Sequence, residues 1–78
     1  MADRLIALFA EGLRVDANGL TEDTAPQNTP QWDSLAAMAL VTLMEDTFEV
    51  RLSTREIMKM NSIAAARSVL QAKGVADI

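Results

Sequence analysis

The sequence lacks both cysteine and histidine, and each absence excludes a class of chemistry. Without cysteine the chain has no disulfide, no thiolate metal site and no thiol nucleophile of its own. Without histidine it cannot assemble a Ser-His-Asp triad, so its serines have no obvious general base. Self-contained hydrolytic catalysis is therefore not expected, and we predict that the protein is not an enzyme.

Long apolar runs are missing as well. The longest charge-free apolar stretch extends from Leu35 to Met44 with Thr42 inside it, about half the length that a membrane span requires. The N-terminal segment MADRLIALFAEGL contains acids and an amphipathic pattern, in contrast to the basic start and solid apolar stretch of a secretory signal. These features lead us to expect a soluble, cytoplasmic protein that does not bind membranes.

Basic residues are few in the first part of the chain. Residues 1–50 contain nine acids against two arginines, a net charge of −7, whereas residues 51–78 carry a net charge of +3. No basic stripe is interleaved with aromatic residues, and phosphate contacts supply most non-specific nucleic-acid affinity. We therefore expect no nucleic-acid binding, and we expect a monomer.

The 78 residues are half apolar, which is enough for one small core and too little for two. Apolar residues recur at helical spacing in DRLIALFAEGLRV, which predicts an amphipathic helix over residues 3–15. Gly12 weakens this helix by about 1 kcal/mol unless a neighbouring helix uses the gap that it leaves. From about Asp16 to Asp33 the composition changes to turn formers, which indicates a long ordered loop pinned by Leu20 and Trp32.

Three further helices are predicted. One begins at Asp33 or Ser34 and ends near Phe48, and its expected inward residues are Leu35, Leu40, Leu43, Met44 and Phe48. A short one follows the capping box formed by Ser53 and Glu56 and depends on docking Ile57 and Met60. The last begins after Asn61 or Ser62 and stops at Gly74. The fold class is thus all-α: a four-helix bundle with three main helices, a short third helix and a long loop between helices one and two.

The Asp33-Ser34 pair permits two interpretations. Aspartate and serine are both preferred helix N-caps, so capping alone would account for them. A serine at a helix N-terminus, after a long polar loop and beside an uncharged apolar surface, is also where the helix dipole would favour an attached phosphate ester. The residue types alone do not choose between these two roles.

The order of motifs carries a family resemblance. "DSL" at residues 33–35, the loop with "LTEDTAP", the helix ending in "EDTF", the short "LSTREIMKM" and the closing "NSIAAARSVLQAKG" resemble the acyl carrier proteins and their peptidyl relatives. The resemblance implies one acyl carrier domain over residues 1–78, with 4'-phosphopantetheine attached to Ser34 by a separate phosphopantetheinyl transferase. The thiol of that arm would hold acyl intermediates as thioesters for acyl-loading and acyl-processing enzymes.

Three departures from the family pattern concern partner recognition. Trp32 stands where the common pattern has glycine, and we predict that it packs under the loop. Ala36 and Ala39 replace the acids that fatty-acid carriers place after the modified serine. The short helix, often acidic in the family, is surrounded by Arg51, Arg55 and Lys59. The predicted partner-binding residues are Asp33, Leu35, Met38, Val41, Glu45, Asp46 and Arg55.

Several functions remain open at this point. The carrier would serve fatty-acid-like, polyketide or other specialised biosynthesis. One alternative is a peptidyl or aminoacyl carrier of non-ribosomal synthesis, suggested by the uncharged "SLAAMAL". Another is an unmodified helical interaction module that binds a partner helix through Ala37, Met38 and Val41. The methionines at positions 38, 44, 58 and 60 are interpreted as core filler, with a transient acyl-chain cavity between the second and third helices as the alternative.

Overall fold

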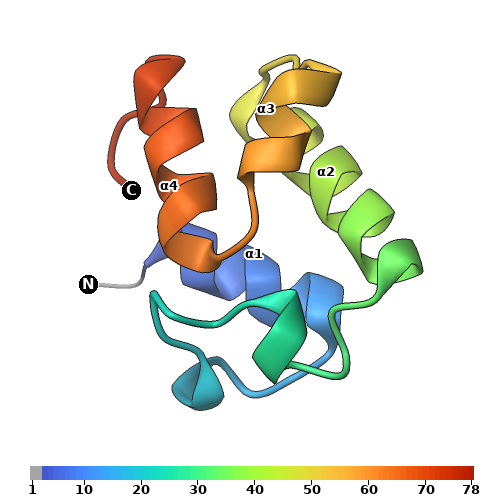
Figure 1. The fold of residues 1–78 in the computed structure, drawn as a ribbon. Coiled ribbons are helices and arrows are strands. Elements are labelled where there is room, and N and C mark those ends of the chain that lie inside the picture. The colour runs from blue at the N-terminus through green and yellow to red at the C-terminus, as the bar shows by residue number, and fades with distance from the viewer. Residues whose placement is uncertain (1–2) are drawn as a thin grey trace.

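The computed structural model describes residues 3–78, and this part of the chain consists of helices and loops without a strand (Figure 1). The helices are α1 (Arg4–Leu13), α2 (Ser34–Phe48), α3 (Thr54–Lys59) and α4 (Ile63–Ala72). Two single turns of 3-10 helix, Ala17–Gly19 and Pro26–Asn28, lie in the loop between α1 and α2. The all-α prediction is confirmed, including the short third helix and the long loop.

Helix α1 begins and ends where local chemistry requires. The Asp3 carboxylate accepts hydrogen bonds from the backbone N–H groups of Leu5 and Ile6 at 3.0 and 3.2 Å, which caps the helix. Arg14 ends it in the left-handed conformation, with φ of 58°. The buried residues of α1 are Leu5, Leu8, Phe9 and Leu13. They follow the predicted three- and four-residue spacing, so this face of α1 packs into the core.

Gly12 lies where α1 and α2 approach each other closely. A Cβ atom at this position would lie 2.5 Å from Cδ2 of Leu40 and 3.2 Å from Cδ1 of Leu43. The α2 side chains therefore occupy the space that a larger residue would fill. This close packing offsets the cost of a glycine inside a helix, as expected if a neighbouring helix uses the gap.

Helix α2 is capped by Asp33, whose carboxylate accepts a hydrogen bond from the N–H of Ala36 at 2.9 Å. Leu40 and Met44 are its buried residues, four positions apart on one face. The prediction that Leu35 points inward is wrong, because this side chain is 80 % exposed. Leu35 precedes Met44 by nine residues, about two and a half helical turns, and so projects from the opposite side of α2.

Helix α3 is short and is held mainly from one side. The predicted capping box is present: Ser53 Oγ accepts from the N–H of Glu56 at 3.1 Å, and Glu56 Oε1 accepts from the N–H of Ser53 at 2.9 Å. Lys73 of α4 forms an ion pair with Glu56 at 3.1 Å. Met60 is buried at the end of α3, whereas Ile57 docks only in part and is 37 % exposed. α3 is thus fastened to α4 more than to α2.

Helix α4 confirms its predicted limits. Ser62 Oγ accepts a hydrogen bond from the N–H of Ala65 at 3.0 Å and caps the helix. Gly74 follows the C-terminal turn with φ of +91°, a conformation that glycine adopts without steric strain. Its buried residues are Ile63, Ala66 and Leu70. Val69, on the same helix, is half-buried.

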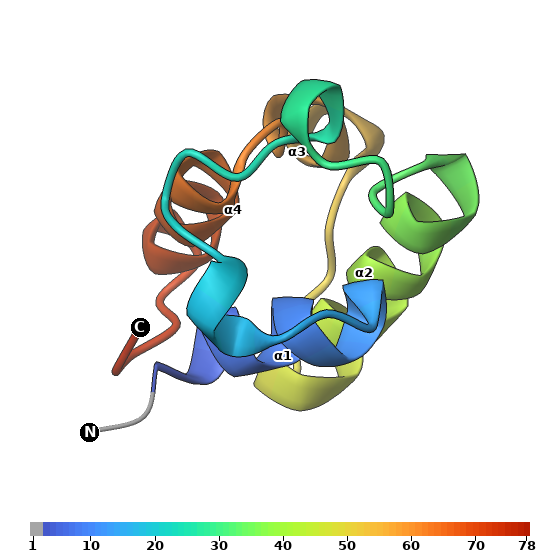
Figure 2. The same ribbon diagram turned by 90° about the horizontal axis from the view of Figure 1, so that it is seen from below.

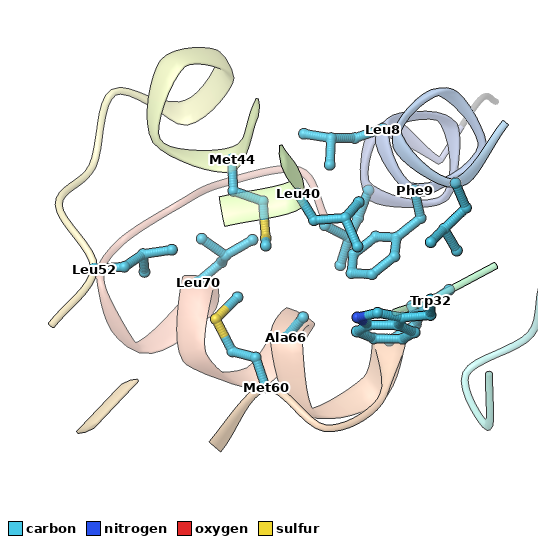
Figure 3. Packing of buried hydrophobic residues seen from close by; sticks show 12 residues of the cluster. Leu8, Phe9, Trp32, Leu40, Met44, Leu52, Met60, Ala66 and Leu70 are labelled. Atoms are coloured by element: carbon cyan, nitrogen blue, oxygen red, sulfur yellow. The ribbon is translucent and has the colours of Figure 1, made fainter. Parts of the chain in front are cut away.

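The core joins α1, α2, α4, Met60 just after α3, and Trp32 of the long loop (Figure 3). Phe9 of α1 and Trp32 at the end of the loop meet edge to face, with ring centroids 5.1 Å apart and an interplanar angle of 62°. Met44, Met60 and Leu70 fill the space further along the bundle. Trp32 therefore packs under the loop, as predicted. None of the helices in residues 3–78 is long and apolar enough to cross a membrane.

The loop between α1 and α2 is also fastened to α4 (Figure 2). The N–H groups of Ile63 and Ala64 donate to the carbonyl oxygens of Thr24 and Glu22, both at 3.0 Å. The guanidinium of Arg67 contacts a carboxylate oxygen of Glu22 at 2.7 Å and one of Asp3 at 2.8 Å. Burial alone would raise the pKa of Asp3, but the hydrogen bond from Arg67 and those from the backbone leave it lowered. This three-residue clamp, Asp3–Arg67–Glu22, was not predicted.

Replacing Arg67 with glutamine is expected to lower the free energy of unfolding by about 1 kcal/mol at neutral pH, because two partly exposed ion pairs are lost. The folded-state pKa of Asp3 is lowered. The stability that Asp3 contributes is therefore fully present above its unfolded pKa of about 4. This contribution is lost as the pH falls through the pKa of Asp3 in the folded protein. Urea unfolding at pH 7 and pH 3 measures the difference. An equal difference at both pH values would contradict the clamp.

Amide hydrogen exchange is expected to be faster in α3 than in the other helices. A six-residue helix cannot persist without docking, and α3 relies on Met60 and on the pair between Glu56 and Lys73. The buried middle of α2, residues 40–44, should exchange slowly. The amides of Ile63 and Ala64 should also be protected by their bonds to the loop. Equal protection of α3 and α2 would show that α3 is not the mobile helix.

Candidate functional site

Asp33 and Ser34 at the N-terminus of α2 differ in what they do. The sequence left open which of them caps the helix. Asp33 provides the helix cap through its bond to the N–H of Ala36. Ser34 is the first residue of the helix, and its side chain is exposed. Within residues 3–78 the Ser34 hydroxyl has no hydrogen-bond partner. The cap of α2 therefore does not use Ser34 Oγ, which is free for chemistry.

A shallow depression of about 280 Å³ surrounds Ser34, lined by Pro26, Trp32, Asp33, Ser34 and Ala37. Its position is set by the loop, because the buried Trp32 ring fixes the chain immediately before the helix. The helix dipole places partial positive charge at this end of α2, and the first turn carries no acidic residue. An exposed, unpartnered hydroxyl at such a position fits the attachment of a phosphate ester.

An apolar groove continues from this depression between α2 and α3. It has a volume of about 290 Å³ and is lined by Ala37, Met38, Val41, Thr42 and Ile57. Ala37 lines both hollows, so the groove adjoins Ser34 directly. Below the groove lies a small internal cavity of about 40 Å³, and its lining also includes Ala37, Val41 and Ile57. Apolar surface thus extends from the Ser34 depression towards the core.

The methionines at positions 38, 44, 58 and 60 differ in their surroundings. Met44 and Met60 are buried in the core, as the interpretation as core filler predicts. They also line the small internal cavity. Met38 is 70 % exposed and lines the groove. Met58 is 77 % exposed on α3, so the interpretation as core filler is wrong for both Met38 and Met58. A helix of six residues cannot bury every face, and Met58 occupies the outer one.

The residues predicted to bind partners do not form one uniform patch. Leu35 and Met38 are exposed along the first turns of α2, with half-buried Val41 further along. Asp46 is exposed near the other end of α2, and Arg55 is exposed on α3. Glu45 has a structural contact of its own, because its Oε2 accepts a hydrogen bond from the N–H of Leu52 at 2.9 Å.

The predicted partner-binding residues did not include two exposed apolar residues of α3, Ile57 and Met58. Their exposure could have been expected from the sequence, because a helix of only one or two turns can bury few of its residues against the bundle. The described residues contain no cluster of three or more carboxylates arranged to hold a metal ion. The chemistry of this region is thus that of a free hydroxyl beside an apolar groove.

The comparisons with known proteins agree with this geometry. Residues 3–66 match the family described as "Phosphopantetheine attachment site", from the start of α1 into the first turn of α4. A search of curated proteins gave no match. Domains of this family are non-catalytic carriers that hold 4'-phosphopantetheine on a serine. The chain therefore belongs to the phosphopantetheine-binding carrier family, and it works with a phosphopantetheinyl transferase and with acyl-processing partners.

Proposed function

We propose that Ser34 is the serine that carries 4'-phosphopantetheine. The observation that supports this assignment is the division of roles at the start of α2, where Asp33 caps the helix and leaves the Ser34 hydroxyl exposed and unpartnered. An enzyme that transfers a phosphopantetheinyl group to a serine needs an accessible oxygen with no competing hydrogen bond. Ser34 meets both conditions.

The other three serines of the chain are less suitable. Ser53 Oγ accepts the N–H of Glu56 within the capping box of α3, and Ser62 Oγ accepts the N–H of Ala65 at the start of α4. Ser68 lies inside α4, outside the residues that match the family. Ser34 is thus the one serine of the four that lies at a helix N-terminus without serving as a cap.

The bound group supplies a terminal thiol that holds an acyl or aminoacyl intermediate as a thioester. The chain itself has no thiol, so its own residues provide position and surface. The N-terminal amides of α2 favour the negative charge of the phosphate ester. Asp33 and Trp32 fix the start of that helix, which holds Ser34 at the surface. A flexible tether on a rigid helix raises the effective concentration of the intermediate at each partner.

We propose further that the intermediates are acyl groups of fatty-acid-like, polyketide or other specialised biosynthesis. This proposal is supported by the apolar groove next to Ser34, which Ala37, Met38, Val41 and Ile57 line. The internal cavity of about 40 Å³ provides little more than the volume of one water molecule, about 30 Å³. An acyl chain would therefore find apolar surface in the groove before any in the core.

A peptidyl or aminoacyl carrier is the second candidate. One observation favours it: Ala36 is half-buried and Ala39 is exposed, so the α2 surface after Ser34 presents methyl groups where fatty-acid carriers present acids. Such a surface would suit partners that recognise α2 through apolar contacts.

Two measurements test these proposals in order. Treatment with coenzyme A and a broad-specificity transferase should add one phosphopantetheine group to the intact mass of the protein. No mass increase would leave the protein as an unmodified interaction module. The holo protein is then offered to a malonyl transferase and to amino-acid adenylating enzymes. Acyl loading supports the acyl carrier, and aminoacyl loading alone would favour the second candidate.

A further inference from the structure

The exposed large apolar side chains of the described chain come from two helices that border one groove. They are Leu35, Met38, Ile57 and Met58, from the first turns of α2 and from α3. Exposed apolar residues scattered singly are common on soluble proteins, whereas a contiguous group marks an interaction surface. Ile57 and Met38 both line the groove beside Ser34, which joins the contributions of the two helices.

The α3 part of this surface is basic. Arg55 lies one turn before Met58 and Lys59, so these three exposed side chains form one stripe in which Arg55 neighbours both of the others. The acid of this helix, Glu56, points elsewhere and pairs with Lys73 of α4. None of the ion pairs found within residues 3–78 involves Arg55 or Lys59. Arg51, exposed just before the helix, adds a third cation.

We propose that the stripe of Arg55, Met58 and Lys59 docks a protein partner whose contacting face carries carboxylates around an apolar depression. The partner is an acyl-loading or acyl-processing enzyme, so this inference rests on the proposed function. It specifies in addition that the docking face of that enzyme is acidic. Complementary charges steer the encounter and reject partners of like charge. The cations of α3 therefore select an acidic docking face.

Other occupants of the surface fit less well. A second copy placed by two-fold symmetry would bring the same cations face to face, which is unfavourable. Nucleic-acid binding relies on many contacts between basic residues and phosphates, and three cations are too few for it. Recognition of anionic lipid needs about four to eight basic residues in a cluster, and α3 with its preceding loop provides three.

The probe for this proposal is a pair of fatty-acid malonyl transferases. One has its native docking face, expected from the family resemblance to be basic, and the other has the basic residues of that face replaced with glutamate. The apo protein, labelled with ¹⁵N, is titrated with each enzyme at low and high salt. We expect the acidic-faced enzyme to bind more tightly at low salt, with the largest chemical-shift changes at residues 55–59. The loading rate of the holo protein should follow the same order.

A matched pair of variants separates the stripe from net charge. Arg55→Glu is expected to weaken binding of the acidic-faced enzyme about three- to tenfold. Arg14→Glu makes the same charge change at an exposed arginine at the end of α1, and it should alter the affinity less than twofold. Met58→Ser should weaken binding without changing its salt dependence. Circular dichroism verifies that each variant folds.

Several outcomes would overturn the proposal. Tighter binding of the basic-faced enzyme, or an equal loss in Arg14→Glu and Arg55→Glu, would show that the stripe does not select the partner. Binding to phosphatidylserine vesicles that Arg55→Glu abolishes would assign the stripe to a lipid surface. A dimer in sedimentation that Arg55→Glu dissociates would assign it to a second copy. The titration uses apo protein, so a failure of phosphopantetheine attachment would appear separately, in the intact mass.

Discussion

Ser34→Ala is expected to abolish the mass increase on treatment with coenzyme A and a transferase, while the stability of the protein changes by less than about 0.5 kcal/mol. The loss should be complete, because no other atom can replace the Ser34 oxygen in the ester. The fold should persist because the cap of α2 is the carboxylate of Asp33, bonded to the N–H of Ala36 at 2.9 Å. Intact-mass spectrometry and urea unfolding measure the two effects.

Ser53→Ala is the matched control, with the opposite pattern expected. It removes the hydroxyl that caps α3 and accepts the N–H of Glu56, which should lower the stability by about 1 kcal/mol. It should leave the mass increase intact, since Ser34 is untouched. If Ser34→Ala were still modified, the attachment residue would be another serine. If Ser34→Ala unfolded the protein, Ser34 would have a structural role that its exposed hydroxyl does not suggest.

Helix limits were the most predictable part of the fold, because they depend on residues close in sequence. Ser53 and Glu56 form their capping box, Ser62 caps α4, and Gly74 ends it with a positive φ. Each of these devices depends on the conformation of one residue or on partners three residues apart. The sequence alone is sufficient to place such caps, as it was for Asp33 or Ser34 at the start of α2.

The inward face of α2 could not be predicted in the same way. From Leu35 to Met44 this helix is apolar on nearly every side, so hydrophobic periodicity does not single out one face. The structure buries Leu40 and Met44 and exposes Leu35 and Met38. The choice is made by the approach of α1, where Gly12 leaves room for Leu40. Contacts between helices, which no local pattern encodes, decided which apolar residues remain at the surface beside Ser34.

Long-range polar contacts were also beyond the sequence. Arg67 lies 64 residues from Asp3 and 45 residues from Glu22, yet its guanidinium bonds to both carboxylates. The role of Glu45 was equally hidden, since it holds the N–H of Leu52 after the end of α2. The choice of cap between the neighbouring Asp33 and Ser34 was also left open by the sequence, because only the geometry shows that Asp33 alone provides the cap. Ser34 was thus predictable as the candidate residue. That its hydroxyl is free because Asp33 caps the helix was not.

Phe9→Ala is expected to lower the free energy of unfolding by about 3–5 kcal/mol, the range for removing a buried aromatic ring. Phe9 is fully buried, and its ring meets Trp32 edge to face at 5.1 Å. A domain of this size has about 4–12 kcal/mol of stability in total, so this loss is a large share of it and should lower the unfolding temperature markedly. Urea unfolding followed by circular dichroism measures the loss, and the fluorescence of Trp32 reports its exposure.

Phe9→Leu is the matched control for this substitution. It keeps most of the apolar volume and removes the aromatic contact, so it should lower the stability by about 1–1.5 kcal/mol. Because Trp32 fixes the chain just before Asp33, the alanine variant should also be modified more slowly at Ser34 under conditions in which it remains folded. A loss below about 1 kcal/mol in Phe9→Ala would contradict the packing of Phe9 under Trp32, since even a relaxed cavity costs more than this. Unchanged Trp32 fluorescence in that variant would point to the same conclusion.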